Sequence, residues 1–449
     1  MSSLRPTDPF TLWRTAVERA GGVRAYVEAQ LAERGFAVER RETDAMSDRE
    51  REAYKASLKA EAAERRTLSR EAWRAHKAAH VVHLGEGVFW AEGRGPDRWD
   101  LPGAETRAAE NELPPLDSAR QLAEALGLTV AELRWLTYHR DAATAIHYRR
   151  FTIPKRDGSH RAIWAPMPKL KAAQRWVLRN VVEKLLVHGS VHGFLPGRST
   201  LSNASAHPDP DLVVKVDIKD FFPTVTLPRV KGVFRKAGYR EEVATLLALI
   251  CTESPREVVT LDGKTYYVAL GPRCLPQGAP TSPALTNTLG LRLDRRLNGL
   301  ARKLGWRYTR YADDLTFSLP AGHAGPPRVG ALLGCVRRVV EGEGFAVHPD
   351  KTAVARRGGR QAVTGLVVNG VAPPRAPREF RRRLRAAVHN RARGKPAPEG
   401  ESLSTLLGMA AYVYMTDPVA GAKYLDALRE LDLPVETTGG PGPPPSGRS

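Results

Sequence analysis

Cysteines and long apolar runs are both scarce in this chain. Its 449 residues include three cysteines, Cys251, Cys274 and Cys335, and no two of them form a Cys-x-x-Cys pair. A disulfide framework or a cysteine-based zinc site is therefore not expected. The longest strongly apolar run, "VATLLALIC", is far shorter than the roughly 20 residues that cross a membrane. The N-terminal sequence lacks the apolar core of a secretory signal, so we expect a soluble cytoplasmic protein without a membrane partner.

Acidic residues are also in deficit. The chain has 69 Lys and Arg residues against 49 Asp and Glu residues, which gives a formal net charge of +20 and a pI near 10.1. A coding preference for arginine would explain the choice of base but not the excess of bases over acids. The excess predicts a polyanionic partner. With 42% hydrophobic residues the composition is that of a folded protein. The length predicts about two to four domains.

Changes in composition divide the chain into segments. Residues 12–34 and 48–79 are rich in helix formers, and a Gly/Pro-rich loop is expected at 91–105. Thr129 and Glu132 have the spacing of a helix capping box. The stretch "TIPKRDGSHRAIW" predicts a β-hairpin with an Asp-Gly tip, and residues 169–189 have the apolar spacing of a helix. Short strands are expected from residue 212, basic helices after residue 370, and a disordered tail at 435–449.

Three aspartates interrupt segments that otherwise have the composition of strands. Asp217 lies in the apolar run "LVVKVDIKDFF", and Asp313 and Asp314 are adjacent in "RYADDLTFS". The simplest alternatives are a solvated hairpin tip for the adjacent pair and a local ion pair of Asp217 with Lys215 or Lys219. If the hairpin lies beside the first strand, however, three carboxylates repel one another unless divalent cations bind them.

Clustered carboxylates of this kind predict a particular chemistry. Mg²⁺ prefers hard oxygen ligands and keeps positions open for water or substrate phosphates. Two such ions roughly 3.5–4 Å apart can clamp the attacking and leaving oxygens of a phosphoryl displacement. We therefore expect two Mg²⁺ ions, which Mn²⁺ can replace.

Five motifs, in order, resemble those of reverse transcriptases. They are "IPKRDGSHRAIWAP" for the fingers hairpin, "VDIKDFF" for the first palm aspartate, "LPQGAPTSPALTN" for the Gln-Gly motif, "YADD" for the YxDD signature and "GFAVHPDKT" for the palm motif that carries a lysine. Two shorter segments, "NASAH" at 203–207 and "VTG" at 363–365, are similar to markers of bacterial retron reverse transcriptases, of the group II intron/retron lineage. The resemblance covers roughly residues 113–433.

The resemblance implies an α+β chain with the right-hand polymerase fold. The fingers would occupy residues 113–208, the palm 209–370 and the thumb 371–434. Residues 1–112 would form an additional, mainly helical N-terminal region, whose role the resemblance does not specify.

The family's functional residues can be carried over onto matching positions. Asp217 and Asp313 would hold both metal ions, Asp314 would support the metal or the primer end, and the backbone carbonyl of Ile218 could add a ligand. The residues that would contact the incoming nucleotide are Lys155, Arg161, Asp220, Phe221, Phe222, Gln277 and Lys351.

Several of these residues also have a purely structural interpretation. The basic hairpin could simply be exposed, and Phe222 could be core packing rather than a ring that excludes a ribose 2′-OH. Lys351 is a candidate proton donor to pyrophosphate, or only a charge near it. By the same resemblance, the residues that would recognise RNA or template are Asn203, His207, Val363, Thr364, Gly365, Arg378, Arg381, Arg382 and Arg385. Residues 371–395 hold nine Lys or Arg and one acid, an excess unusual for a merely solvated helix face.

The family resemblance implies an RNA-directed DNA polymerase that uses dNTPs. It would copy part of a structured noncoding RNA into DNA, starting from a 2′-OH of that RNA, and yield an RNA–DNA product. Many members act in phage defence with an effector or toxin protein. Two alternatives remain at this point, a group II intron-type maturase and a catalytically idle RNA-binding scaffold. Retention of all three aspartates disfavours the idle scaffold.

Overall fold

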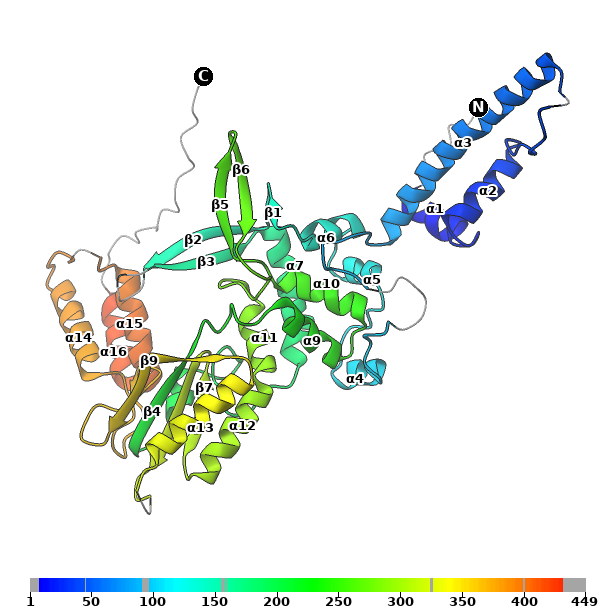
Figure 1. The fold of residues 1–449 in the computed structure, drawn as a ribbon. Coiled ribbons are helices and arrows are strands. Elements are labelled where there is room, and N and C mark those ends of the chain that lie inside the picture. Colours follow the sequence, from blue (N-terminus) through cyan, green and yellow to red (C-terminus); the bar gives the residue numbers. More distant parts are fainter. Residues whose placement is uncertain are drawn as a thin grey trace. The chain divides into compact units, whose positions relative to one another are not determined.

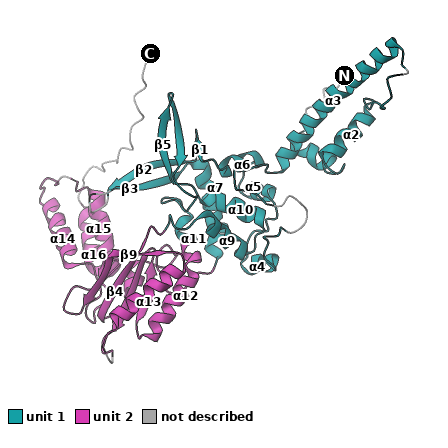
Figure 2. Ribbon diagram, in the orientation of Figure 1, with its two compact units in different colours: residues 1–185, 222–285 teal, residues 186–221, 286–449 magenta. Residues whose placement is uncertain are grey.

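The structure, a computed structural model, describes residues 8–44, 46–90, 97–154, 158, 160–323, 326–398 and 400–430 (Figure 1). The chain forms two compact units, each made of two separate stretches (Figure 2). The first unit comprises residues 1–185 and 222–285, and the second comprises residues 186–221 and 286–449. Among the described residues, no helix combines the length and apolar character needed to cross a membrane.

A four-stranded antiparallel sheet forms the centre of the second unit, in the order β7-β8-β4-β9. The strands are β4 (Pro210–Lys219), β7 (Arg307–Tyr311), β8 (Asp314–Pro320) and β9 (Ala346–Arg356). Consecutive residues Val213 and Val214 of β4 are both buried, so this strand is covered on both faces, as its apolar run predicts. Two helices, α12 (Leu291–Lys303) and α13 (Val329–Gly342), contact each other and the strands β7 and β9 (Figure 1).

Shorter elements and three helices complete the second unit. They are α8 (Thr200–Ser205), β10 (Ala362–Val363), β11 (Leu366–Val367), α14 (Arg378–Ala392), α15 (Leu403–Thr416) and α16 (Pro418–Arg429). Leu384, Leu406 and Val413 lie in a separate apolar core among the last three helices. The prediction of basic helical structure after residue 370 is confirmed by α14.

The first unit surrounds the almost fully buried helix α10 (Glu241–Cys251). Its other helices are α4 (Ala104–Glu110), α5 (Ala119–Ala125), α6 (Val130–Thr137), α7 (Pro168–Asn180), a 3₁₀ turn (Val182–Lys184) and α9 (Leu227–Ala237), while α11 (Ser282–Leu289) begins in this unit and ends in the other. Its strands are β1 (Ala142–Ala143), β2 (Tyr148–Pro154), β3 (His160–Pro166), β5 (Arg256–Leu261) and β6 (Lys264–Ala269). Strands β2 and β3 form the predicted hairpin, and β1, β6 and β5 form a second sheet. The predicted capping box of Thr129 and Glu132 begins α6.

The N-terminal region is helical, as predicted. It contains α1 (Pro9–Leu12), a π-helical turn (Trp13–Val17), α2 (Val23–Glu33) and α3 (Asp48–Ala79). Helix α3 has the predicted bounds and begins with a capping box at Ser47. The single helix predicted at 12–34 is wrong because Gly21 and Gly22 adopt φ values of 94° and 113°, which interrupt a right-handed helix.

The helix predicted over residues 169–189 is also too long. Helix α7 ends at Asn180, and Val181 has a φ of −126° that stops the helical path. Val177, Val181 and Leu185 are nevertheless buried. The 3.6-residue apolar spacing therefore identified the buried face but not the point where the chain turns away. The predicted tail at 435–449 lies outside the described residues.

Candidate active site

Strand register brings the three aspartates together. Asp217 near the end of β4 lies directly opposite Asp314 at the start of β8. The backbone carbonyl of Asp313 accepts a hydrogen bond of 3.0 Å from the N–H of Ile218. Side chains opposite each other in an antiparallel pair have Cβ atoms roughly 4.5–5.5 Å apart. The end of the central sheet thus gathers three carboxyl groups from two segments almost 100 positions apart.

A tight turn presents Asp313. Tyr311 pairs with Asp314, so only Ala312 and Asp313 lie between β7 and β8. Ala312 has a φ of 57° in the left-handed region, as a two-residue hairpin turn requires and as non-glycine residues seldom adopt. The surrounding protein must therefore hold this turn in place.

A buried ion pair lies directly behind the turn. Arg310 and Asp294 are both fully buried, with Arg310 Nη2 and Asp294 Oδ2 2.8 Å apart and Arg310 Nε 2.8 Å from Asp294 Oδ1. Arg310 Nη1 donates to the Ala312 carbonyl at 3.1 Å and to Asn287 Oδ1 at 3.2 Å, and Tyr308 donates its hydroxyl proton to Asp294. Although burial alone would lower it, the Asp294 carboxylate raises the pKa of Arg310. The guanidinium therefore stays charged and fixes the carbonyl of the left-handed residue.

Sequence reasoning missed this pair. Its signal is an acidic residue on the buried face of a helix, because Asp294, Leu297 and Ala301 share one face of α12 and are all fully buried. The space around the guanidinium is also tight. A Cβ at Gly290 would lie 2.8 Å from Arg310 Nη2, so only glycine fits there without displacement of the arginine.

The lysine that pairs with Asp217 is Lys351, on β9. Its Nζ lies 3.1 Å and 3.3 Å from the two carboxylate oxygens. The register between β4 and β9 shifts between Lys215 and Asp217, which changes the pairing of β9 beside the carboxylate. Lys215 lies on β4, as Asp217 does. Burial lowers the pKa of Lys215, although the negative charge of Asp314 acts in the opposite direction. The predicted ion pair of Asp217 with Lys215 or Lys219 is thus replaced by a long-range one.

Crowding changes the ionisation of Asp314. Desolvation of its carboxyl and the neighbouring charges of Asp313 and Asp217 raise the pKa of Asp314 to about 6, although Lys215 and Lys351 act in the opposite direction. The site therefore holds more negative charge than its two lysines balance, and a cation would relieve the repulsion.

Comparison with known proteins identifies the family. The profile of the reverse transcriptase (RNA-dependent DNA polymerase) family matches residues 153–381. The chain is 57% identical over 427 residues to the retron Mx162 reverse transcriptase of Myxococcus xanthus, covering 93% of this chain and 88% of that protein. The chain belongs to the retron-type reverse transcriptases. Its enzymatic activity is RNA-directed DNA synthesis.

Two further relatives support this assignment. The retron Mx65 reverse transcriptase of Myxococcus xanthus is 46% identical over 319 residues, which cover 71% of this chain and 73% of the relative. The retron Ec86 reverse transcriptase of Escherichia coli is 30% identical over 326 residues, which cover 71% of this chain and 91% of the relative. The family match implies fingers, palm and thumb, and the mixed helix-and-sheet structure with a helical N-terminal region agrees with it.

Reverse transcriptases use divalent metal ions, and the carboxylates of this retron-type enzyme fit such ions. Within the described residues no group of three or more His, Cys, Asp or Glu side chains is arranged to hold a metal by itself. Mg²⁺ is usually bound by one or two carboxylates together with substrate phosphates, so a complete protein cage is not required. Desolvation and the nearby charges of Asp313 and Asp217 raise the pKa of Asp314, and this crowding of carboxyl groups is the observation that fits a cation here.

The fingers hairpin of the reverse transcriptase contacts the Gln-Gly motif. The N–H of Trp164 on β3 donates to the Gln277 carbonyl at 2.7 Å. Gly278 has a φ of 119°, and a Cβ there would lie 2.8 Å from the carbonyl oxygen of Trp164. Arg161 is exposed on the same strand, opposite Ile153. Gln277 and the hairpin thus form one local assembly, and the predicted Lys155 lies outside the described residues.

The two adjacent phenylalanines after β4 differ in burial. Asp220 is exposed with a φ of 47°, and Phe221 is buried with its ring 5.3 Å from that of Phe345. Phe222 is half-buried, and its carbonyl accepts a hydrogen bond from the N–H of Val225. The Phe221 ring is thus part of the core, which leaves its backbone as the group for the predicted nucleotide contact.

The two retron markers meet inside the second unit. Asn203 and His207 have an exposed fraction of 0%. His207 is hydrogen-bonded to Ser318 at 2.6 Å and to Thr309 at 2.7 Å, on strands β8 and β7, and burial lowers the pKa of His207 to about 3. Neither Asn203 nor His207 can reach RNA in this conformation. The neutral imidazole instead ties α8 and its following turn to the hairpin that carries Asp313 and Asp314.

The second marker forms a two-residue turn. Val363 pairs with Leu366, and Thr364 and Gly365 between them have φ values of 44° and 86°. Thr364 Oγ1 donates to the Thr200 carbonyl at 3.0 Å and accepts from Asn203 Nδ2 at 3.4 Å. The markers therefore bind each other, and the direct RNA contacts expected of their side chains have no support from this geometry.

The predicted thumb arginines lie on α14. Arg378, Arg382 and Arg385 are exposed, while Arg381 is half-buried. A wide, open hollow of about 720 Å³ follows this helix, lined by Glu379, Arg382, Arg383, Arg385, Ala386 and His389. Leu384, Ala387 and Val388 face the apolar core instead. The exposed face can thus attract a phosphate backbone.

The ion pair behind the turn supplies the first prediction. Arg310→Met leaves the Asp294 charge buried without its partner, so it should lower the stability of the second unit by about 3–5 kcal/mol, measured by denaturant unfolding. The double variant Arg310→Met with Asp294→Leu should regain much of this stability, because no charge stays unpaired. It still lacks the bond to the Ala312 carbonyl, so primer extension should remain at least tenfold reduced. Full activity of a stable double variant would contradict the positioning role.

Asp314 supplies the second prediction, tested in EDTA. A folded-state pKa raised to about 6 favours the protonated carboxyl, and this stabilisation disappears as the pH rises through that value. Asp314→Asn should therefore raise the thermal midpoint relative to the wild type most at pH 8, less at pH 5, and little below the unfolded-state pKa of 3.8. Asp262→Asn, at the β5–β6 turn, is the control and should show no such pH dependence. An equal change for Asp314→Asn at pH 8 and at pH 5 would refute the assignment.

Proposed function

We propose that this reverse transcriptase copies part of a structured noncoding RNA into DNA, starting from a 2′-OH of that RNA, to give a branched RNA–DNA product (msDNA). The observation that carries the catalytic part is the opposition of Asp217 and Asp314 across β4 and β8, with Asp313 on the turn. The retron names of its relatives support the RNA-primed part.

Asp217 and Asp313 would hold two Mg²⁺ ions, for which Mn²⁺ can substitute, with help from Asp314 and the Ile218 carbonyl. When bound, such ions supply charge stabilisation at the attacking and leaving oxygens. Lys351 Nζ lies 3.1 Å from Asp217 Oδ1, which supports a role for this lysine beside the departing pyrophosphate. Its role as a proton donor or as a nearby charge is part of the proposal.

The nucleotide would be selected by residues of the family motifs. Phe222 would stack under the deoxyribose and leave no space for a 2′-OH. Arg161 and Lys155 would pair with the triphosphate, Asp220 and Phe221 would offer backbone N–H groups, and Gln277 would contact the nucleotide or template. The contact between the Gln277 carbonyl and β3 supports a shared action of hairpin and motif.

The RNA would be held mainly by charge. The exposed arginines of α14 would grip the phosphate backbone with an affinity that falls as salt rises. Such contacts position the RNA but do not select its sequence. We also propose that the protein acts in the cytoplasm, in phage defence, together with an effector or toxin protein. This part of the proposal is supported by the family resemblance.

The catalytic assignment is tested with a preannealed primer. Asp313→Asn should abolish dNTP incorporation on an RNA template in Mg²⁺ or Mn²⁺, by at least about a hundredfold, because a ligand charge is lost. Circular dichroism should show an unchanged fold, and Asp262→Asn should keep full activity as the matched control. Undiminished synthesis by Asp313→Asn would end the assignment of this residue as a metal ligand.

The priming assignment is tested with the RNA encoded beside the gene. Incubation with that RNA, dNTPs and Mg²⁺, without added primer, should give DNA joined to RNA through a 2′ linkage. The linkage should resist ribonuclease and alkali at one nucleotide and yield to a debranching enzyme. Synthesis from free 3′-OH primers alone would favour a maturase-like reaction instead.

A further inference from the structure

A pocket in the first unit, on elements distinct from the catalytic strands, combines arginines with exposed aromatic rings. It has a volume of about 270 Å³, and helix α6, β1 and the segments that follow them contribute to its lining. The lining residues used below are Arg134, Trp135, Tyr138, Arg140, His147, Glu253 and Arg256. The volume is below the roughly 300–1,000 Å³ of sites that enclose a whole drug-sized ligand, so it suits one flat ring system.

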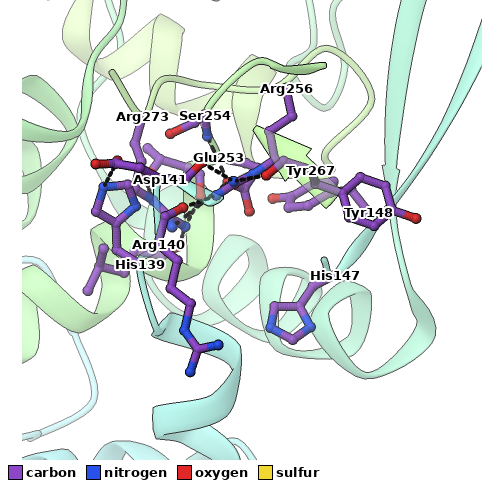
Figure 3. Close-up of polar contacts among 12 residues, drawn as sticks. His139, Arg140, Asp141, His147, Tyr148, Glu253, Ser254, Arg256, Tyr267 and Arg273 are labelled. Atoms are coloured by element: carbon purple, nitrogen blue, oxygen red, sulfur yellow. Dashed lines mark hydrogen bonds and ion pairs between the residues drawn. The ribbon is translucent and has the colours of Figure 1, made fainter. Parts of the chain in front are cut away.

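The floor of the pocket is rigid and electrostatically balanced. Glu253 is 7% exposed, and its Oε1 lies 3.1 Å from Arg256 Nη2 and 3.9 Å from Arg273 Nη1 (Figure 3). Burial alone would raise the pKa of the Glu253 carboxyl, but Arg273 and Arg256 lower it. Arg256 also donates to the carbonyls of Arg140 and Tyr267, both at 2.9 Å. This cluster fixes the backbone from which Arg140 extends.

The positive charge of the pocket is not neutralised by its own carboxylate. Arg134, Arg140 and Arg256 line it against the single acid Glu253, which Arg273 also faces. Arg140 is exposed, and its guanidinium lies 4.6 Å from the centre of the Tyr138 ring. Among the described residues its side chain forms no hydrogen bond or ion pair. The guanidinium N–H groups of Arg140 are thus available to an anionic group of a bound ligand.

The aromatic rings are held in place by neighbouring groups. Arg134 lies 5.3 Å from the centre of the Tyr138 ring, and its Nε donates to the Val82 carbonyl at 2.7 Å. The Trp135 residue is 55% exposed, although its ring meets that of His147 edge to face at 4.2 Å. An exposed indole on a fixed helix offers a stacking surface whose ordering costs little conformational entropy.

His147 completes the lining as a neutral group. Burial lowers its pKa, so the ring carries no charge at neutral pH. Its Nε2 lies 2.8 Å from the Trp135 carbonyl, an oxygen that can only accept, so Nε2 carries the proton. Nδ1 is left as an acceptor, which a base N–H could reach. In Figure 3 the side chains of His147 and Arg140 both extend below the Glu253 cluster.

We propose that this pocket binds one unpaired nucleotide of single-stranded RNA, with the base stacked on Trp135 and the adjoining phosphate on Arg140. Aromatic stacking combined with arginine contacts is the usual way in which proteins bind single strands. A duplex would not enter, because its bases are already stacked and paired. The site would hold a single-stranded part of the RNA and thereby add affinity for the template.

The test measures binding of fluorescent single-stranded oligouridylate to the full chain, in EDTA and without dNTPs. These conditions separate the pocket from catalysis and from the priming reaction. Trp135→Ala should weaken binding by about 5- to 150-fold, the range expected for loss of one stacked base. Trp135→Phe should restore most of the affinity. Trp73→Ala, which removes an indole that is 48% exposed on α3, is the matched control and should leave binding unchanged.

Salt dependence separates the two contacts. Arg140→Gln should reduce the slope of the logarithm of the binding constant against the logarithm of salt concentration by about 0.7, the value for one phosphate contact on a single strand. Trp135→Ala should leave that slope unchanged, as should the control Arg70→Gln on α3. Equal binding by wild type and Trp135→Ala would overturn the proposal. The proposal would also be overturned if Trp135→Ala weakened the binding of double-stranded RNA of the same length by an equal factor.

Discussion

The buried pair of Arg310 and Asp294 is the constraint on which the turn that carries Asp313 depends. A two-residue turn with an alanine in the left-handed region is strained, and the bond from Arg310 Nη1 to the Ala312 carbonyl holds it. Asp294 keeps the guanidinium charged inside the protein, and Gly290 leaves the space that the guanidinium fills. A charge without its partner at this depth would be strongly destabilising. The position of Asp313 therefore depends on a buried ion pair in the core of the second unit.

The residues of the two retron markers also form buried contacts with the β7–β8 hairpin or with each other. His207 links the turn after α8 to both strands that flank "YADD", while Thr364 joins α8 to the β10–β11 turn through Thr200 and Asn203. His207 thus reaches β7 and β8 through buried hydrogen bonds, while Thr364 and Asn203 bond to each other.

Positive charge is distributed unevenly over the functions of the chain. Lys351 pairs with Asp217, and the guanidinium of Arg310 is paired with Asp294 in the core. The exposed arginines of α14 form one further group, and Arg134 and Arg140 beside the aromatic rings form another. The first group offers an open basic face suited to phosphates in general. The second is combined with aromatic rings, which suits the bases of a single strand. The net charge alone could not separate these uses.

The sequence alone determined the chemistry and much of the local structure. Motif order identified the three aspartates, the apolar run of β4 predicted a doubly covered strand, composition gave the bounds of α3, and the capping signal at Thr129 located the start of α6. The helix predicted from composition at 12–34 is interrupted at Gly21, and the helix predicted from apolar spacing at 169–189 ends before Val181, because local backbone angles decide both points. Tertiary structure decided which charges pair and which markers are buried. Asp217 meets Lys351 and His207 meets Ser318 across more than 100 positions, and such partners are set by strand register, which local propensity does not encode.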